Sequence, residues 1–374
     1  MRILVEHGSR SLDNVGDIAQ LQSSLGRLRA LFPRAALVVP TSSPERLANL
    51  VPDARPHHER GFVARASRSS SWLRGVRQRS FEQRLRHVDL LVVAGGGFLN
   101  SSFPRHARNV AELALAAFER DIPVAFFGQM IGPFNNEVLR RSVSEALQVA
   151  GIVSLRMGTS EKRGLRSLGI ADDRLYFTGD EALAVLSSSP TTSFTGDLGL
   201  NVRTTGYANV NRSRRDRIIG VVRRASVDHG LALSWCPIAL HRDGDTPPVG
   251  AASPVGIFNA PPTTAVELMI QRIGGLRLLV TGSYHAAVFA VGQGVPVVAL
   301  SASPYYDQKF ADLASYFPDR VTVVDLLSEK SDLALKVSID HSIDLGVIDA
   351  SATVSRLVSS SAASYLQLPR LVSF

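Results

Sequence analysis

Residues 90–100 read LLVVAGGGFLN, which is a short apolar run followed by three consecutive glycines. A run of this length that ends in glycine is typical of a buried strand followed by a tight turn. Residues 278–282, LLVTG, repeat the pattern in the second half of the chain. Two such units predict two similar sheets that face one cleft.

Other apolar runs alternate with longer segments of helical period, which predicts an α/β fold of parallel strands joined by crossover helices. We expect helices at residues 18–31, 107–120 and 137–150. Besides residues 90–94 and 278–281, the expected strands are residues 3–5, 36–39, 124–127, 152–155, 175–177, 198–202, 231–236, 296–300 and 321–324.

A polar segment rich in helix and strand breakers, SSSPTTSFTG at residues 187–196, separates the two series of strands. We interpret it as a linker between an N-terminal domain of residues 1–188 and a C-terminal domain of residues 197–374. The length of 374 residues suits two domains, each large enough for its own core. A closing helix at residues 350–367 could pack on either domain.

Composition excludes several classes of protein. With 45% hydrophobic and 20% charged residues, the chain is neither disordered nor fibrous. The net charge of +8 favours anionic ligands without choosing among them. Cys236 is the only cysteine, so no metal site with zinc spacing is expected. No signal peptide or membrane-spanning run is apparent, which predicts a cytoplasmic protein that could also act at the inner membrane surface.

Candidate site residues in the first half follow predicted strands. Asp17, in NVGD at residues 14–17, either caps a helix or points into the crevice beyond the strand ends. Gly95, Gly96 and Gly97 form either a simple turn or an anion-binding nest at a helix start. Gln129 lies in a predicted loop, GQMIGP, after another strand.

Charged residues follow four further strands. Arg156 and Asp180 either form a salt bridge between neighbouring strands or face the cleft. Arg203 is a fork-shaped donor suited to carboxylate or phosphate. His285, in TGSYHAA at residues 281–287, is either a structural histidine or the partner of Arg203 at one anion site.

Eight arginines crowd one segment that contains two acidic residues. A solvated surface is the ordinary interpretation, and docking of an acidic acceptor is the alternative. A nucleic-acid partner is not predicted, because no stacking platform or binding motif accompanies the charge. The arginines are Arg60, Arg65, Arg68, Arg74, Arg77, Arg79, Arg84 and Arg86.

Seven motifs, in their order and spacing, resemble the polysaccharide pyruvyl transferase family. They span most of the chain, and together they are far more specific than any one alone. The motifs are NVGD at 14–17, LLVVAGGGFLN at 90–100, FFGQMIGP at 126–133, SLRMGTSEKRGLRSLGI at 154–170, YFTGDEAL at 176–183, LNVR at 200–203 and TGSYHAAVFAVGQGVPVVAL at 281–300.

The resemblance implies two Rossmann-like domains around a deep cleft, as in B-type glycosyltransferases, with the acceptor on the N-terminal side and the donor on the C-terminal side. It also implies transfer of a pyruvyl group from phosphoenolpyruvate to two hydroxyls of one sugar, which forms a ketal and releases phosphate without a cofactor. The acceptor would be a sugar or glycan, lipid-linked acceptors included. By the match, Arg203 and His285 hold the donor, His285 is a candidate acid, and Asp17 orients or deprotonates the acceptor.

Two positions depart from the family pattern. The pattern resembles Arg-Leu-His where this chain has Ser283, Tyr284 and His285, so a cation expected near the donor is missing. Lys309 lies near a lysine of the pattern and could replace that cation. Glu181 stands where the family usually carries proline.

Two other functions stay open from the sequence. A nucleotide-sugar-dependent glycosyltransferase would suit the same architecture, and Ser283 with Tyr284 could contact a neutral sugar or nucleotide. No GxGxxG or P-loop motif supports nucleotide chemistry, however. A non-catalytic anion- or glycan-binding protein is the second alternative. The oligomeric state is not predicted.

Overall fold

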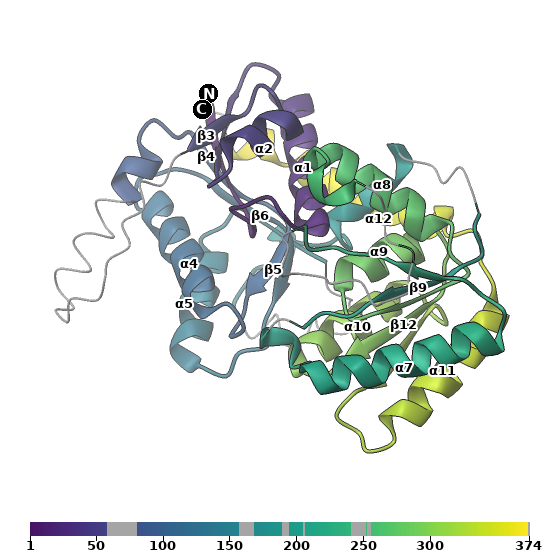
Figure 1. Cartoon of the computed structure of the whole chain (residues 1–374). Coiled ribbons are helices and arrows are strands. Elements are labelled where there is room, and N and C mark those ends of the chain that lie inside the picture. The colour runs from purple at the N-terminus through teal and green to yellow at the C-terminus, as the bar shows by residue number, and fades with distance from the viewer. Residues whose placement is uncertain are drawn as a thin grey trace.

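The computed structural model describes residues 1–57, 81–156, 168–188, 194–204, 206–240, 252 and 256–372. Two parallel sheets with helices packed against them make up the described part of the chain (Figure 1). The α/β class predicted from the sequence is therefore confirmed.

The first sheet has the order β3-β2-β1-β4-β6-β7-β8, and β5 pairs with β6. Every strand pair in it is parallel. The long apolar run of β6 is buried along its whole length, as parallel strands covered on both faces require. The strands are β1 (Arg2–Glu6), β2 (Ala36–Pro40), β3 (Arg55–His57), β4 (Leu90–Val93), β5 (Gly96–Leu99), β6 (Val124–Ile131), β7 (Ile152–Leu155) and β8 (Leu175–Phe177).

The second sheet has the order β10-β9-β11-β12-β13 and is also parallel throughout. Each strand predicted for the second half has a counterpart, with ends that differ by at most two residues. The strands are β9 (Leu198–Asn201), β10 (Leu233–Trp235), β11 (Leu278–Thr281), β12 (Val297–Ser301) and β13 (Val321–Asp325).

The helices connect these strands. Those of the first half are α1 (Val15–Leu31), α2 (Pro44–Leu50), α4 (Pro104–Phe118) and α5 (Glu137–Gln148). Those of the second half are α7 (Arg212–Asp228), α8 (Pro262–Gly274), α9 (Tyr284–Gly292), α10 (Pro304–Tyr316), α11 (Ser331–Leu345), α12 (Ser351–Tyr365) and α13 (Leu368–Leu371). Short 3₁₀ segments are η2 (Asp172–Arg174), η3 (Glu181–Ser188), η4 (Gly206–Ala208) and η5 (Ile257–Asn259).

Strand order reverses once in each sheet, at β1/β4 in the first and at β9/β11 in the second. Ligands of open α/β sheets bind beyond the carboxyl ends of the strands at such a point. The segments that follow these four strands contain predicted site residues, namely Asp17, Gly95 to Gly97, Arg203 and His285.

The glycine run differs from the prediction. Gly96 and Gly97 belong to the short strand β5, and the next helix, α4, begins only at Pro104. The predicted anion nest at a helix start is therefore wrong. The predicted loop around Gln129 is also wrong, because β6 continues to Ile131 and pairs with β5.

The two sheets are joined through the start of α1. Asn14 forms an isolated antiparallel bridge with Ala239, which follows β10. The Val15 amide donates to the Ile238 carbonyl at 2.9 Å, and the Leu240 amide donates to the Asp13 carbonyl at 2.7 Å. These hydrogen bonds fix the first turn of α1 against the segment after β10.

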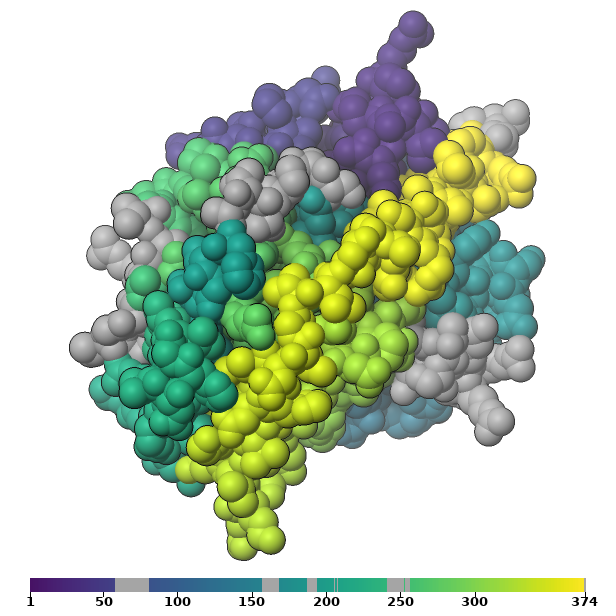
Figure 2. Space-filling model, turned by 90° about the vertical axis from the view of Figure 1, so that its right-hand side faces the viewer, coloured from purple at the N-terminus to yellow at the C-terminus, as the bar shows by residue number. Residues whose placement is uncertain are grey.

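Helix α12 forms part of the yellow band that runs across the face shown in Figure 2. It packs on β6, β7, β8 and η3 as well as on α9. The Tyr365 ring stacks on Phe127 of β6, with ring centroids 3.7 Å apart. The helix begins and ends close to the range that the sequence predicts, and it contacts elements of both halves of the chain.

Candidate active site

The N-terminus of α1 supplies an acidic side chain to the crevice. Asn14, not Asp17, caps this helix: its side chain accepts hydrogen bonds from the amides of Gly16 and Asp17 at 3.1 and 3.3 Å. The capping role considered for Asp17 is therefore wrong. Because Asn14 already satisfies these amides, the partly exposed carboxylate of Asp17 stays free to face the crevice.

Gly16 brings α1 into direct contact with the second sheet's site. A Cβ atom built on Gly16 would lie 1.9 Å from Cγ and Nδ1 of His285. His285 stands in the first turn of α9, directly after β11, and is buried. Only a residue without a side chain allows this approach, so the sequence Val15-Gly16-Asp17 positions an acid from one half beside a histidine from the other.

The Asp180 carboxylate binds several polar groups at the base of the site. Its carboxylate accepts hydrogen bonds from Arg156 Nη1 at 2.7 Å, from Gln20 Nε2 at 2.9 and 3.0 Å and from the Ala182 amide at 2.8 Å. His285 Nε2 lies 3.9 Å from the same carboxylate. The predicted Arg156–Asp180 salt bridge is thus present, and it also borders the crevice through His285.

Lys309 projects from α10 into a group of tyrosines. Its Nζ lies 4.2 Å from the ring centroid of Tyr305, 5.2 Å from that of Tyr284 and 5.6 Å from that of Tyr306. The Arg156 guanidinium lies over the Tyr284 ring at 4.5 Å. The Tyr284 ring therefore lies close to two cations and attracts both.

Gly97 explains part of the glycine run. A Cβ atom on it would lie 2.4 Å from Arg156 Nη2 and 3.1 Å from Lys309 Nζ. Its carbonyl accepts a hydrogen bond from the Tyr305 hydroxyl at 2.8 Å. The sequence suggested that glycines there admit a ligand, whereas the nearest atoms belong to the protein's own cationic side chains.

Arg203 follows β9 and is buried beside the start of α9. A Cβ atom on Gly282 would lie 3.4 Å from the Arg203 backbone nitrogen, so the two strand ends touch. Arg203 also lines a pocket of about 400 Å³ together with Asp17. The other lining residues are Gly8, Ser9, Arg10, Ser11, Asp13, Asn14, Ser42 and Ala239.

The electrostatics of the site follow from burial and from its three cations. The surrounding protein desolvates Asp17 and raises its pKa to about 6, although Lys309, Arg156 and Arg203 oppose the shift. Burial lowers the pKa of His285 to about 3; nearby Asp180 acts the other way. Burial and the neighbouring Arg156 charge hold the pKa of Lys309 well below its usual range. At pH 7 the site thus contains a carboxylate and a neutral imidazole, and burial makes the ammonium form of Lys309 less favourable than it is in water.

Two predicted site residues are buried and form hydrogen bonds within the protein. Gln129 is fully buried, and its Nε2 donates to the carbonyls of Ala94 at 2.6 Å and Phe127 at 2.9 Å. It therefore supports the end of β4 instead of facing the crevice. Ser283 is buried just before α9, where its amide donates to Thr281 Oγ1 at 2.9 Å.

Most of the arginine-rich segment lies outside the described residues, which include only Arg84 and Arg86 of the eight. Arg86 is exposed, whereas Arg84 is buried and forms an ion pair with Glu6 at the end of β1. Arg10 pairs with the same carboxylate. Burial opposes ionisation of Glu6, but the two arginines lower its pKa to about 2. The interpretation of the segment as a solvated surface is therefore wrong at Arg84.

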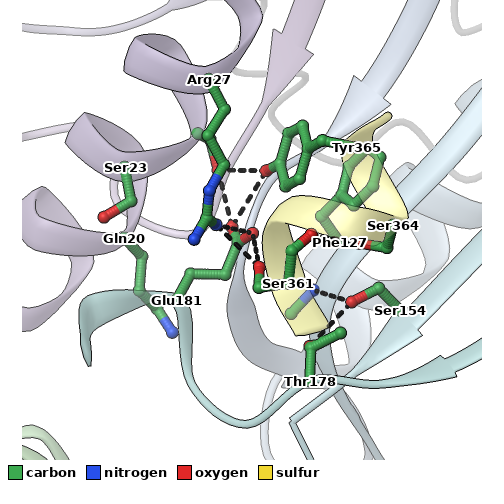
Figure 3. Close-up of polar contacts among 12 residues, drawn as sticks. Gln20, Ser23, Arg27, Phe127, Ser154, Thr178, Glu181, Ser361, Ser364 and Tyr365 are labelled. Atoms are coloured by element: carbon green, nitrogen blue, oxygen red, sulfur yellow. Dashed lines mark hydrogen bonds and ion pairs between the residues drawn. The ribbon is translucent and has the colours of Figure 1, made fainter. Parts of the chain in front are cut away.

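A second buried acid, Glu181, contacts side chains of α1 and α12 (Figure 3). It accepts hydrogen bonds from Ser24 Oγ at 2.7 Å, Arg27 Nη1 at 3.1 Å and the Tyr365 hydroxyl at 3.1 Å. These partners lie on α1 and α12. Glu181, which directly follows Asp180, therefore holds both helices against η3. The sequence analysis registered Glu181 only as a departure from the family pattern.

Gln20 and Tyr305 are site residues that the sequence analysis missed. Gln20 lies one helical turn after Asp17 and binds Asp180, while Tyr305 begins α10 and faces Lys309. The i, i+3 spacing from Asp17 was a signal for Gln20. Nothing in the local pattern distinguishes Tyr305 from a core aromatic residue.

Within the described ranges, no group of three or more His, Cys, Asp or Glu side chains is arranged to hold a metal ion. No helix of the described residues is long and apolar enough to cross a membrane.

Comparison with solved structures places the fold. A UDP-GlcNAc 2-epimerase from Neisseria meningitidis is 13% identical, with a TM-score of 0.60 over 99% of this chain and 100% of that one. A UDP-GlcNAc 2-epimerase from Methanocaldococcus jannaschii is 13% identical, with a TM-score of 0.61 over 98% and 99%. The glycotransferase of kitacinnamycin is 11% identical, with a TM-score of 0.58 over 100% and 99%. A search of curated protein sequences finds no match.

The chain therefore has the fold of B-type glycosyltransferases and related epimerases, in which two Rossmann-like units face one crevice. The family model for polysaccharide pyruvyl transferases matches residues 14–304. The chain belongs to the polysaccharide pyruvyl transferase family, whose members are polysaccharide-modifying transferases. The family and fold predicted from the sequence are confirmed.

Proposed function

We propose that this protein transfers a pyruvyl group from phosphoenolpyruvate to two hydroxyls of one sugar, forming a cyclic ketal and releasing phosphate. No metal or redox cofactor takes part. The proposal rests on one observation above all: Arg156, Arg203 and Lys309 meet at one crevice beside His285 and Asp17.

The cations suit the donor, which carries a carboxylate and a phosphate. Asp180 balances the charge of Arg156, whereas Lys309 lies among tyrosine rings and forms no direct ion pair with a carboxylate of the described residues. We assign Arg203 and Lys309 to the donor's two anionic groups, and His285 adds a neutral hydrogen-bonding group. Lys309 and Arg156 both lie close to the Tyr284 ring, and we assign to them the role of the cation that the family pattern has at position 283.

Asp17 suits the acceptor. With a pKa of about 6 it is mainly ionised at pH 7, yet basic enough to take a proton from a hydroxyl. It lines the 400 Å³ pocket, whose serine hydroxyls and carboxylates can bind sugar hydroxyls. Pockets of about 300–1,000 Å³ are usual for small ligands. A terminal sugar of a glycan, lipid-linked or free, is the acceptor class, and the reaction belongs in the cytoplasm with its donor.

The chemistry proceeds in two additions. A proton joins the methylene carbon of phosphoenolpyruvate as its double bond opens, and a sugar hydroxyl attacks the adjacent carbon while losing its own proton. The bond from that carbon to the phosphate oxygen then breaks, and a second hydroxyl of the same sugar attacks. Phosphate leaves with one proton, so atoms and charge balance.

Ligand protection and phosphate release together test the proposal. Phosphoenolpyruvate should raise the melting temperature, whereas UDP and UDP-sugars should not. Arg203→Ala should abolish this protection, and Arg212→Ala, an exposed arginine on α7, should preserve it. With sugar acceptors, phosphate should be released in proportion to ketal formed.

Selective protection by a nucleotide instead would overturn the proposal in favour of nucleotide-sugar chemistry. Protection by acidic glycans with no turnover of any donor would indicate a binding protein.

A further inference from the structure

We propose that Lys309, and not His285, delivers the proton to the methylene carbon of the donor. The proposal rests on the function proposed above and assigns the acid that this function needs. It follows from the surroundings of the two side chains.

Lys309 is a buried ammonium group without a carboxylate partner. Its side chain is 7% exposed and lies among the rings of Tyr284, Tyr305 and Tyr306. Among the described residues, no carboxylate forms a direct ion pair with it, and Asp17 and Asp180 act on it only from a distance. An ammonium group that lies among ring faces loses its proton more readily than one in a direct ion pair with a carboxylate, because the ion pair stabilises the charged form.

The charged groups around Lys309 strengthen this tendency. Arg156 approaches it across Gly97, and Arg203 adds a second positive charge, while Asp17 and Asp180 act in the opposite direction. Because Asp180 binds Arg156 directly, it neutralises that guanidinium more than it stabilises the lysine. The net effect lowers the pKa of Lys309, so a proton transfer to carbon costs less.

His285 is poorly placed to be the acid. Its ring is covered by Gly16, it is 8% exposed, and at pH 7 it is neutral because its pKa is about 3. Its nearest carboxylate, Asp180, already binds Arg156, Gln20 and a backbone amide. A neutral imidazole can donate a hydrogen bond to the donor but has no extra proton to give.

A cycle that uses Lys309 and Asp17 balances. Lys309 gives a proton to the methylene carbon, and Asp17 takes one from the first sugar hydroxyl as the carbon–oxygen bond forms. Protonated Asp17 then gives its proton to the departing phosphate. Neutral Lys309 takes the proton of the second hydroxyl as the ketal closes. Both groups return to their starting states, and each lies close enough to shift the other's pKa.

Lys309→Arg separates charge from proton transfer, because arginine keeps the positive charge but cannot be deprotonated in a protein. The expected result is preserved thermal protection by phosphoenolpyruvate with turnover lowered at least about 100-fold, the usual contribution of a general acid. Lys336→Arg, on the exposed surface of α11, is the matched control and should retain full turnover.

A chemical readout excludes a merely structural role. Lys309→Met should be inactive, and added methylamine should restore part of its turnover by supplying an ammonium group in the vacated space. The wild-type rate should also fall at high pH through a basic limb that the residual rate of Lys309→Arg lacks.

Wild-type turnover in Lys309→Arg together with loss of turnover in His285→Gln would overturn the assignment and restore His285 as the acid. Failure of methylamine rescue, combined with loss of donor binding in Lys309→Arg, also counts against it. Absence of phosphoenolpyruvate binding and turnover in the wild type is a different result, which refutes the proposed function itself.

Discussion

Replacing Gly16 by alanine tests the contact on which the site depends. The new Cβ would lie 1.9 Å from two ring atoms of His285 and 2.3 Å from its Cβ. Because the histidine's Cβ is fixed to the backbone of α9, a change of rotamer cannot relieve the clash. Helices α1 and α9 must separate by about 1.5 Å to restore van der Waals contact.

Two opposing effects determine how much Gly16→Ala changes the free energy of unfolding. Alanine in a helix gains up to about 1 kcal/mol over glycine. Overpacking a buried contact costs about 1–3 kcal/mol, and the rigid clash places this case at the upper end. We therefore expect the free energy of unfolding to fall by about 1–2 kcal/mol. Displacing Asp17 from His285 by an ångström or more should lower turnover about 100-fold.

Gly26 of the same helix provides the matched control. No atom outside its immediate surroundings lies within 4 Å of a Cβ built there. Gly26→Ala should therefore raise the free energy of unfolding by about 0.5–1 kcal/mol and leave turnover unchanged. Urea unfolding and phosphate release, measured on both variants and on the wild type, provide the comparison.

The reasoning is refuted if Gly16→Ala is as stable as Gly26→Ala and retains wild-type turnover. That result would mean that α1 and α9 do not approach each other in the working enzyme. A stable but inactive Gly16→Ala would instead locate the effect in the geometry of the site alone.

Three further predictions concern the charges and the closing helix. Burial raises the pKa of Asp17 from 3.8 to about 6, so the stability that its protonated form contributes is full below pH 4 and is lost as pH rises through 6. Asp17→Asn should therefore be inactive, yet about 1–3 kcal/mol more stable than the wild type at pH 8 and no more stable at pH 4. Urea titrations at both pH values measure this difference. Arg84→Met leaves the buried Glu6 carboxylate with Arg10 as its remaining ion-pair partner in the described structure. The free energy of unfolding should fall by about 3 kcal/mol at pH 7. A loss below about 0.5 kcal/mol in calorimetry would argue against the buried pair. Tyr365→Phe keeps the stack on Phe127 but removes the hydroxyl that contacts Glu181 and should cost about 1–2 kcal/mol in thermal unfolding, with unchanged stability contradicting the contact.

The sequence predicts the sheets well, because short apolar runs that end in glycine have few alternatives to buried parallel strands. It also predicts that Arg203 and His285 stand at neighbouring strand ends, as β9 and β11 place them. It misplaces Gln129, because a polar residue between glycines resembles a loop until its amide is seen to bind the end of β4.

Contacts between residues that lie far apart in the sequence cannot be predicted from the local sequence pattern. The glycines of residues 95–97 signal close approach, but nothing in their neighbourhood says that Arg156 and Lys309 make that approach from 59 or more residues away. Tyr305 and Gln20 join the site for the same reason, through helices whose packing is decided by the whole fold. Spacing along the chain therefore identifies strand ends, whereas the identity of the facing side chain depends on tertiary structure.

The charges of the crevice oppose folding and favour binding. Burial raises the pKa of Asp17 and lowers those of His285 and Lys309, so each of the three groups is less stable in its charged form than it would be in water. An anionic donor opposes this shift for Lys309, because its negative charge stabilises the ammonium form. The protein thus pays part of the cost of binding in advance, during folding. A crevice arranged in this way should select against neutral ligands by leaving its buried cations uncompensated, which is the physical basis for expecting an anionic donor here and not merely a glycan.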